Sequence, residues 1–224
     1  MARPTVSHQQ GSRQSKTATP SASRLAMEQR ILRGAEQVFA EYGFRGASMD
    51  RIANHIGISK QNVIYYFSSK ETLYRTVLQN IVNLWLESMS FCEDDAQSPQ
   101  AVIANYIQGK LRLSRDYPDA SKVFAQEIIS GAPMIKAYLQ QNLKPLFERD
   151  VALVRQWIDN GYLRVFEPEH LFFAIWSATQ TYADFSAQIQ LVMNKNQLDE
   201  HDFDAATEFL TQMILRGIVA PEAV

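Results

Sequence analysis

The sequence predicts an all-α protein, in which a small three-helix helix-turn-helix domain is followed by a larger helical domain. Apolar residues recur at helical spacing from Leu25 almost to the end of the 224-residue chain. Breaks that contain Gly or Pro divide this pattern into separate helical segments. Charge also divides the chain into two parts, before and after residue 75. Residues 1–75 hold 11 of the 22 Lys and Arg and 5 of the 24 Asp and Glu, a net of +6, so residues 76–224 carry 11 against 19, a net of −8.

Residues 1–24 precede the first helical pattern and are predicted to be a disordered basic tail. They are rich in Ser, Thr, Gln and Ala, contain four basic residues and no acid, and offer nothing that would bury a core. Two interpretations fit this composition. The tail is either a solvating segment or a basic arm that follows phosphates or enters a minor groove.

The next pattern predicts three short helices. The first covers residues 25–43 and stops at Gly43. Ser48 caps a second helix, which Gly57 ends because glycine enters the left-handed conformation without steric cost. Ser59 then caps a third helix, and its first turn carries amide and basic side chains, namely Lys60, Gln61 and Asn62.

Two helices around a glycine turn, the second led by polar side chains, are typical of a helix-turn-helix DNA reader. An ordinary helical hairpin with a solvated second helix fits the spacing equally well, but the net charge of +6 favours a polyanionic partner. The 25–43 helix mixes acids with bases and so lacks a basic face for lipid. We therefore expect Lys60, Gln61 and Asn62 to face base edges, beside the cap Ser59, because Gln and Asn match adenine and Lys matches guanine or phosphate. The expected phosphate ligands are Ser48, Tyr65, Tyr66 and Lys70.

Three runs in this region, Phe44–Ala53, Gly57–Lys60 and Ile64–Leu73, resemble the DNA-binding domain of the tetracycline-repressor (TetR) family. The resemblance covers residues 25–75, and Tyr65-Tyr66-Phe67 followed by Lys70-Glu71 is its most specific part. It implies a homodimer with a DNA-binding domain at 25–70 and a ligand-binding and dimerisation domain at 71–220. It also implies that the partners are double-stranded operator DNA and a small-molecule effector.

Breaks along the rest of the chain predict the helices of the second domain. Ser68 and Glu71 form a capping box for a long helix over 68–91, whose apolar positions include Leu73, Val77, Ile81 and Leu84. The acidic stretch 93–99 is predicted as a loop. Further helices are expected from Ser98 to about 116, from Pro118 to about 130, and from 133 to 158 with a kink or division at Pro145.

Two helices, over 168–188 and 201–219, complete the pattern and carry wide apolar faces. Such helices can complete the monomer core or form half of an isologous four-helix interface. The family resemblance favours the interface. The expected interface residues are Leu171, Ile175, Leu210, Met213 and Ile214.

Polar and aromatic side chains alternate on the first of these helices. Trp176, Thr179, Gln180 and Asp184 lie at helical spacing, a mixture that suits a small, flat, polar ligand but also suits a core helix whose polar groups meet partners or water. Trp85 on the 68–91 helix is a similar case. We take these five residues as the candidate ligand site.

A narrower resemblance supports that site. The runs Trp85-Leu86, Tyr106–Leu111, Ser114–Ser121, Gly131–Pro133 and Trp176–Phe185 look like the pyrimidine-utilisation repressor branch, which senses uracil or thymine and controls pyrimidine catabolism. The resemblance implies that Gln180 pairs with the amide edge of the pyrimidine and that Trp85 walls its ring. Thr181 stands where the branch has His, and residues beyond 188 match poorly, so an unrelated flat or hydrophobic effector stays open.

Other functional classes find little support. The four His show no metal-ligand spacing, Cys92 has no evident His partner, and there is no glycine-rich phosphate loop, so we expect no enzyme, cofactor or metal site. No apolar run approaches the roughly 20 residues that span a bilayer. We expect a cytoplasmic protein with no membrane partner. A DNA-binding protein that senses no ligand is the remaining alternative.

Overall fold

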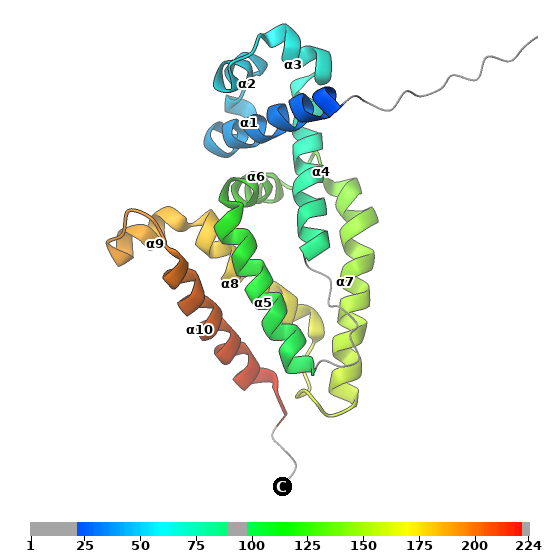
Figure 1. The fold of residues 1–224 in the computed structure, drawn as a ribbon. Helices are drawn as coiled ribbons and strands as arrows, with labels where there is room; N and C mark the ends of the chain where they lie inside the picture. The colour runs from blue at the N-terminus through cyan, green and yellow to red at the C-terminus, as the bar shows by residue number, and fades with distance from the viewer. Residues whose placement is uncertain (1–21, 89–97, 221–224) are drawn as a thin grey trace, which may run out of the picture.

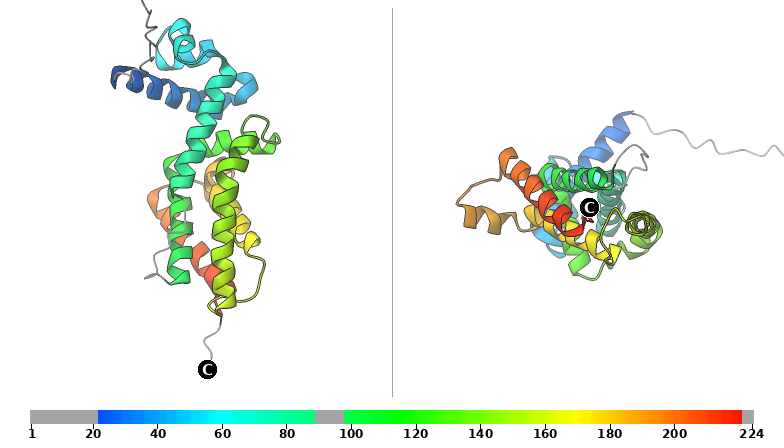
Figure 2. Two further views of the ribbon diagram at one scale, coloured as in Figure 1. Left: turned by 90° about the vertical axis from the view of Figure 1, so that its right-hand side faces the viewer. Right: turned by 90° about the horizontal axis from the view of Figure 1, so that it is seen from below.

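A computed structural model describes residues 22–88 and 98–220, in which the helices are joined by short connections and the one β feature is an isolated bridge between Leu163 and Val219. Figure 1 shows a small bundle of α1–α3 at one end, a larger bundle of α5–α10 at the other, and α4 passing between them. The views in Figure 2 show that the molecule is elongated along α4 and α7. This arrangement confirms the predicted fold class. The basic tail, except for residues 22–24, and the acidic stretch 93–97 lie outside the described residues.

The small bundle, which we call the reader, contains α1 (Ala22–Gly46), α2 (Met49–Ile56) and α3 (Lys60–Tyr66). The backbone leaves the helical conformation at Gly43, where φ is +66°, so the predicted stop is present although one more helical turn follows it. The Ser48 hydroxyl accepts a hydrogen bond from the Arg51 amide, and Gly57 is left-handed with φ +71°. The predicted caps of α2 are therefore confirmed.

The helix α4 (Lys70–Ser88) begins one residue later than the predicted capping box requires. Its cap is Ser69, whose hydroxyl accepts from the Thr72 amide at 3.1 Å, whereas Ser68 is exposed in the turn after α3. The prediction that Ser68 caps this helix was wrong. Phe67 is the C-cap of α3 and has an extended backbone, so the first free amides of α4 come one residue later in the chain than predicted. Leu73, Val77 and Ile81 are buried as expected.

The larger bundle consists of six helices. They are α5 (Pro99–Asp116), α6 (Pro118–Ile129), α7 (Lys136–Asp159), α8 (Pro168–Asp184), α9 (Ser186–Met193) and α10 (Glu200–Ile218). The helix α5 packs against both α8 and α10, and α6 packs against α1, α4 and α8. Ser98 caps α5 as predicted, and α7 continues as one helix through Pro145. No described helix is both long enough and apolar enough to cross a membrane.

The predicted helix over 168–188 is divided in two. Phe185 leaves the helical conformation with φ −113° and ψ 25°, and α9 starts after it. The sequence did not reveal this division because α9 buries no residue, so its apolar side chains carry no periodic signal.

Candidate DNA-reading surface and ligand cavity

The outer face of α3 presents the side chains that were expected to read bases. Gln61 and Asn62 are exposed, while Val63 is fully buried and fixes α3 against the reader core. The Ser59 hydroxyl accepts from the Asn62 amide at 3.2 Å, so its own O–H remains able to donate. Lys60 is on the same surface and pairs with Asp50 at 2.7 Å. Because both partners of that pair are exposed, its contribution is small and DNA phosphate can compete with it.

Two tyrosines at the end of α3 form a neighbouring contact surface. Tyr65 is 69% exposed, and its ring packs edge to face on Tyr66 with centroids 5.2 Å apart. The guanidinium of Arg24 lies 5.7 Å from the Tyr65 ring and 5.9 Å from the Tyr66 ring. The sequence placed Arg24 in the tail, but the structure puts it on the first turn of α1, where it adds a cation beside the expected phosphate ligands.

Lys70 makes contacts within the reader. Its ammonium donates to the Phe44 carbonyl at 2.7 Å and the Ala47 carbonyl at 3.0 Å, and it lies 4.3 Å from the centre of the Phe44 ring. Two of its three donors therefore fasten the end of α1 and the start of α2 to α4. Lys70 therefore stabilises the packing of the reader helices. Ser48, the N-cap of α2, is exposed.

A partly open cavity with a volume of about 70 Å³ lies between α4, α5, α6, α7 and α8. A cavity of this size holds several waters, since one water needs roughly 10–15 Å³ by the same measure. Its lining is mostly apolar and consists of Val82, Trp85, Leu86, Lys110, Phe124, Leu139, Leu143, Trp176 and Gln180. Trp85 packs edge to face on Phe124 at 4.4 Å, and the Trp176 Nε1 donates to the Tyr106 hydroxyl at 2.6 Å, so the aromatic walls are fixed.

Three of the five predicted ligand residues, Trp85, Trp176 and Gln180, line this cavity. Thr179 does not, because its side chain is fully buried and its hydroxyl donates to the Ile175 carbonyl at 2.7 Å. Asp184 does not line it either, since it lies one turn beyond Gln180 and accepts from the Ser121 hydroxyl at 2.5 Å. Helical spacing put all four α8 residues on one broad face, but the cavity meets only part of that face.

Lys110 of α5 is the charged lining residue, and it was not among the predicted ligand residues. Its side chain is only 4% exposed, and its ammonium lies 5.3 Å from the centre of the Trp85 ring. Burial lowers the pKa of Lys110 to about 8, partly offset by the negative charge of Asp184. The signal was present in the sequence, because Tyr106, Lys110 and Ser114 share one face of α5 with apolar residues.

Helix α6, which supplies Phe124 to the cavity lining, also contacts the reader. On α6, Phe124 lines the cavity, and two residues later Gln126 donates to the Ala40 carbonyl of α1 at 3.2 Å. The Glu127 carboxylate accepts from the Met134 amide at 2.6 Å, and the Met134 carbonyl accepts from Arg75 of α4 at 2.8 Å. A displacement of α4 or α6 at the cavity would therefore reach the reader through direct contacts.

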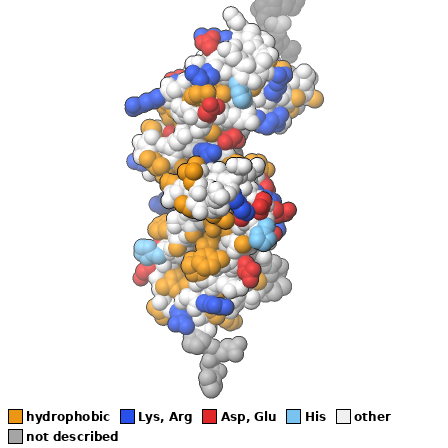
Figure 3. Space-filling view, turned by 90° about the vertical axis from the view of Figure 1, so that its left-hand side faces the viewer, with side chains coloured by type: hydrophobic (Ala, Val, Ile, Leu, Met, Phe, Trp, Pro, Cys, Tyr) orange, Lys and Arg blue, Asp and Glu red, His pale blue; other side chains and the backbone are white. Residues whose placement is uncertain are grey.

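The expected interface residues fall into two groups. Leu171, Ile175 and Leu210 are at most 5% exposed and belong to the monomer core, so their assignment to an interface was wrong. Met213 is 51% exposed, and Ile214 is half-buried. Hydrophobic side chains do gather on this side of the bundle, as Figure 3 shows. The exposed ones on α8–α10 are Phe173, Phe185, Leu191, Val192, Met193, Phe209 and Met213.

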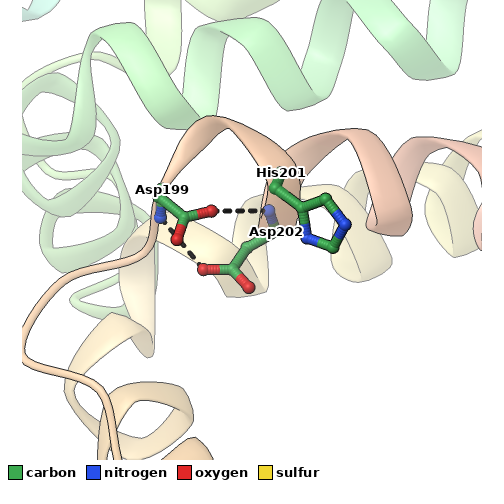
Figure 4. A group of neighbouring side chains, drawn as sticks. All are labelled: Asp199, His201 and Asp202. Carbon is green, nitrogen blue, oxygen red and sulfur yellow. Dashed lines mark hydrogen bonds between the residues drawn. The ribbon is translucent and has the colours of Figure 1, made fainter.

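One His and Asp cluster among the described residues has the proximity of metal ligands. Asp199, His201 and Asp202 lie at the start of α10, with their ligand atoms within 4.8 Å of one another (Figure 4). Asp199 and Asp202 form a capping box, and the Lys195 ammonium contacts both Asp202 oxygens at 2.6 and 2.7 Å. These contacts explain why the three side chains lie close together: the two aspartates cap the N-terminus of α10 and pair with Lys195.

Two family models match successive regions of the chain. Residues 31–77 match the family described as bacterial regulatory proteins, tetR family, and residues 78–221 match the YcdC-like protein, C-terminal region. The chain is 41% identical over 194 residues to the HTH-type transcriptional regulator RutR of Escherichia coli strain K12, covering 86% of this chain and 91% of RutR.

Solved structures share the fold at low sequence identity. The ketosteroid transcriptional regulator KstR2 of Mycobacterium tuberculosis superposes with a TM-score of 0.68 at 18% identity, over 87% of this chain and 96% of that one. AibR, solved with isovaleryl coenzyme A and operator DNA, gives a TM-score of 0.66 at 14% identity, over 83% of this chain and 96% of its own.

Proposed function

This chain belongs to the tetracycline-repressor family of DNA-binding transcriptional regulators, and we propose that it is a homodimeric repressor released from an inverted-repeat operator by a small flat ligand such as uracil or thymine. Its relatives are regulators, and the chain is a regulator rather than an enzyme. The proposed targets are genes of pyrimidine catabolism, and the proposed site of action is the cytoplasm, where the DNA is. The observation that carries the ligand proposal is a cavity that joins Gln180 to Trp85 on the helix leading into the reader.

The DNA contacts follow from the exposed face of α3. Gln61 and Asn62 extend from its first turn, and each can bond to adenine in the major groove. Tyr65, Tyr66 and Arg24 lie at its other end, where hydroxyl and guanidinium groups suit phosphate oxygens. Two readers related by a two-fold axis would contact half-sites about one helical turn apart, so the operator is an inverted repeat.

The proposed dimer interface is the exposed apolar face of α8–α10. A pair of bulky residues on α10, Phe209 and Met213, is one turn apart and 63% and 51% exposed. Exposed apolar patches of this kind mark interaction surfaces. Sedimentation of the Phe209→Glu, Met213→Glu double variant tests the dimer: it should give the 25.5 kDa monomer, whereas the wild type sediments at twice that mass.

The matched control for the dimer is Val165→Glu. Val165 is 92% exposed in the connection before α8, so a charge there should leave the dimer intact. A wild type that sediments as a monomer at micromolar concentration would refute the dimer. A double variant that remains dimeric would refute this choice of face.

The ligand contacts follow from the cavity lining. Gln180 carries a donor and an acceptor on one side chain and can answer the amide edge of a pyrimidine with two hydrogen bonds. Trp85, Phe124 and Trp176 supply aromatic walls for a planar ring. A ring between these groups would press on α4, which continues into the reader, and on α6, where Gln126 donates to the Ala40 carbonyl of α1.

Release from DNA requires that the ligand bind the DNA-incompetent arrangement more tightly, because a ligand shifts an equilibrium only by its differential affinity. Fluorescence anisotropy on a duplex selected by the protein from a random pool tests this switch. Uracil should weaken duplex binding by the wild type. Gln180→Ala should bind the duplex normally and no longer respond. A wild type that shows neither heat nor release with uracil and thymine would overturn the nucleobase assignment.

A second candidate is a repressor that senses an unrelated hydrophobic molecule. The observation in its favour is that Val82, Leu86, Leu139 and Leu143 make much of the cavity wall apolar. AibR, with the same fold, was solved with isovaleryl coenzyme A. The same anisotropy assay separates the two candidates, because a short-chain acyl compound would then release the duplex and uracil would not.

A further inference from the structure

An open groove lies where the reader meets the larger bundle. It has a volume of about 260 Å³ and is lined by residues of α1 and α4, together with Tyr117 at the corner between α5 and α6. The helices α1 and α4 pack against each other, and Figure 1 shows α1 crossing α4. The groove shares no lining residue with the cavity between α4 and α8. It is therefore a separate candidate site, and a molecule bound there would touch both the reader and the helix that leads away from it.

The two helices give the groove walls of different character. Val77, Ile81 and Leu84 of α4 recur at i, i+4 and i+7, so they share one face of the helix and form an apolar wall. The facing helix α1 contributes two opposite charges, Arg33 and Glu36. These residues are three positions apart and are therefore neighbours on the surface of α1. One small molecule can meet both charges and the apolar wall together.

Both charged side chains of the groove are unpaired. Within residues 22–88 and 98–220, neither the Arg33 guanidinium nor the Glu36 carboxylate has a hydrogen-bond or ion-pair partner. Arg33 is exposed, whereas Glu36 is half-buried. Burial, with a smaller repulsion from Asp119, raises the pKa of Glu36 to about 7, as expected for a carboxylate without a compensating cation. A half-buried carboxylate of this kind favours a ligand that supplies the cation.

We propose that this groove binds a free amino acid with an aliphatic side chain, whose ammonium pairs with Glu36 and whose carboxylate pairs with Arg33. The aliphatic side chain packs on Val77 and Ile81, where it leaves water. A zwitterion answers both unpaired charges, whereas a simple amine or a simple acid answers one. The site is distinct from the effector cavity, and the proposal does not depend on the sensing function proposed above.

Three probes of similar shape separate these cases. They are L-leucine, isoamylamine, which is leucine without the carboxylate, and isocaproate, which is leucine without the ammonium. Calorimetry on the full chain at pH 8, where the Glu36 carboxyl is ionised, should show that the wild type binds leucine most tightly. Glu36→Gln should weaken leucine binding roughly tenfold, the loss of one charged hydrogen bond. Arg33→Met should weaken it about two- to fivefold, because the Arg33 pair is exposed.

The matched control is Glu28→Gln, which removes an acid from α1 that lies outside the groove lining. It should bind leucine as the wild type does, and melting curves should show that every variant is folded. If leucine gives no heat with the wild type, or if Glu36→Gln and Arg33→Met both bind it normally, the groove is not an amino-acid site. Isoamylamine that binds as tightly as leucine would overturn the role of Arg33 and leave a simple cation site. In each case the effector cavity and its function are unaffected.

Discussion

The reader and the larger bundle present their candidate binding groups in opposite ways. In the reader, Gln61, Asn62 and Tyr65 stand outside a short helix whose inner residue, Val63, is fully buried. At the cavity, Trp85, Lys110 and Gln180 come from three helices, α4, α5 and α8, and line a partly open space between them. The first surface needs a rigid small core behind it, and the second needs five helices to stay in place. Stability and binding should therefore be separable in the reader but coupled at the cavity.

The largest effect should follow from adding one methyl group to the reader core. A Cβ on Gly34 of α1 would lie 2.0 Å from the Cγ2 of Ile56, a branched atom with little freedom to move. Gly34→Ala should therefore destabilise the reader by about 3 kcal/mol, the upper range for overpacking. Duplex binding should be lost while calorimetry still detects the effector. Gly217→Ala, with nothing within 4 Å, is the control and should keep both activities. Loss of effector binding in Gly34→Ala would show that the two regions fold as one unit.

The next effect concerns the free energy of folding that is lost by burying the Lys110 ammonium at the cavity. The folded-state pKa of Lys110 is about 8, below its ordinary 10.5, so folding favours the neutral amine. That cost is complete below pH 8 and disappears as the pH rises through 10.5, where the unfolded chain also loses the proton. Lys110→Met should raise stability by about 2–3 kcal/mol at pH 7. Denaturant midpoints of both proteins from pH 7 to 10.5 measure this effect. A difference in stability between Lys110→Met and the wild type that widens with pH would contradict it.

A third effect tests the separation of binding from stability in the reader. Gln61→Ala and Asn62→Ala should each cost about 1–3 kcal/mol on the selected duplex and relax base preference, without changing the melting temperature. Lys70→Met is the contrast, because it removes a staple to the Phe44 and Ala47 carbonyls. It should lower the melting temperature and leave base preference intact. Unchanged duplex affinity in both α3 variants would mean that another surface reads the bases.

The smallest effect lies where the two regions meet. Burial, with a smaller repulsion from Asp119 of α6, raises the pKa of Glu36 on α1 from 4.5 to about 7. Folding therefore favours the protonated acid, and stability is lost as the pH rises from 4.5 through 7. Because Glu36 is partly exposed, Glu36→Gln should gain only about 1 kcal/mol at pH 8 and nothing below pH 4.5. Melting from pH 4.5 to 8 measures it, with Glu28→Gln as control. If the difference in stability between Glu36→Gln and the wild type stayed constant across this pH range, the titration of Glu36 would not be its cause.

The sequence by itself determined the features that are settled within one helical turn. Ser48, Gly57, Ser59 and Ser98 cap helices as predicted because their partners lie about three or four residues away along the chain. The exposed face of α3 follows from those same caps and from Val63. The fold class follows as well, since apolar spacing and breaks fix which segments are helical.

Only the tertiary structure decided which residues share a site. Thr179 and Gln180 are neighbours in sequence, yet one donates to its own helix and the other lines the cavity. Leu210 is buried, whereas Phe209 beside it on α10 is 63% exposed on the candidate interface. Successive residues of a helix point about 100° apart, so the orientation of each helix against its neighbours decides such cases. Lys110 meets Trp85 for the same reason: their encounter depends on the packing of α4 against α5, which helical spacing within either segment does not specify.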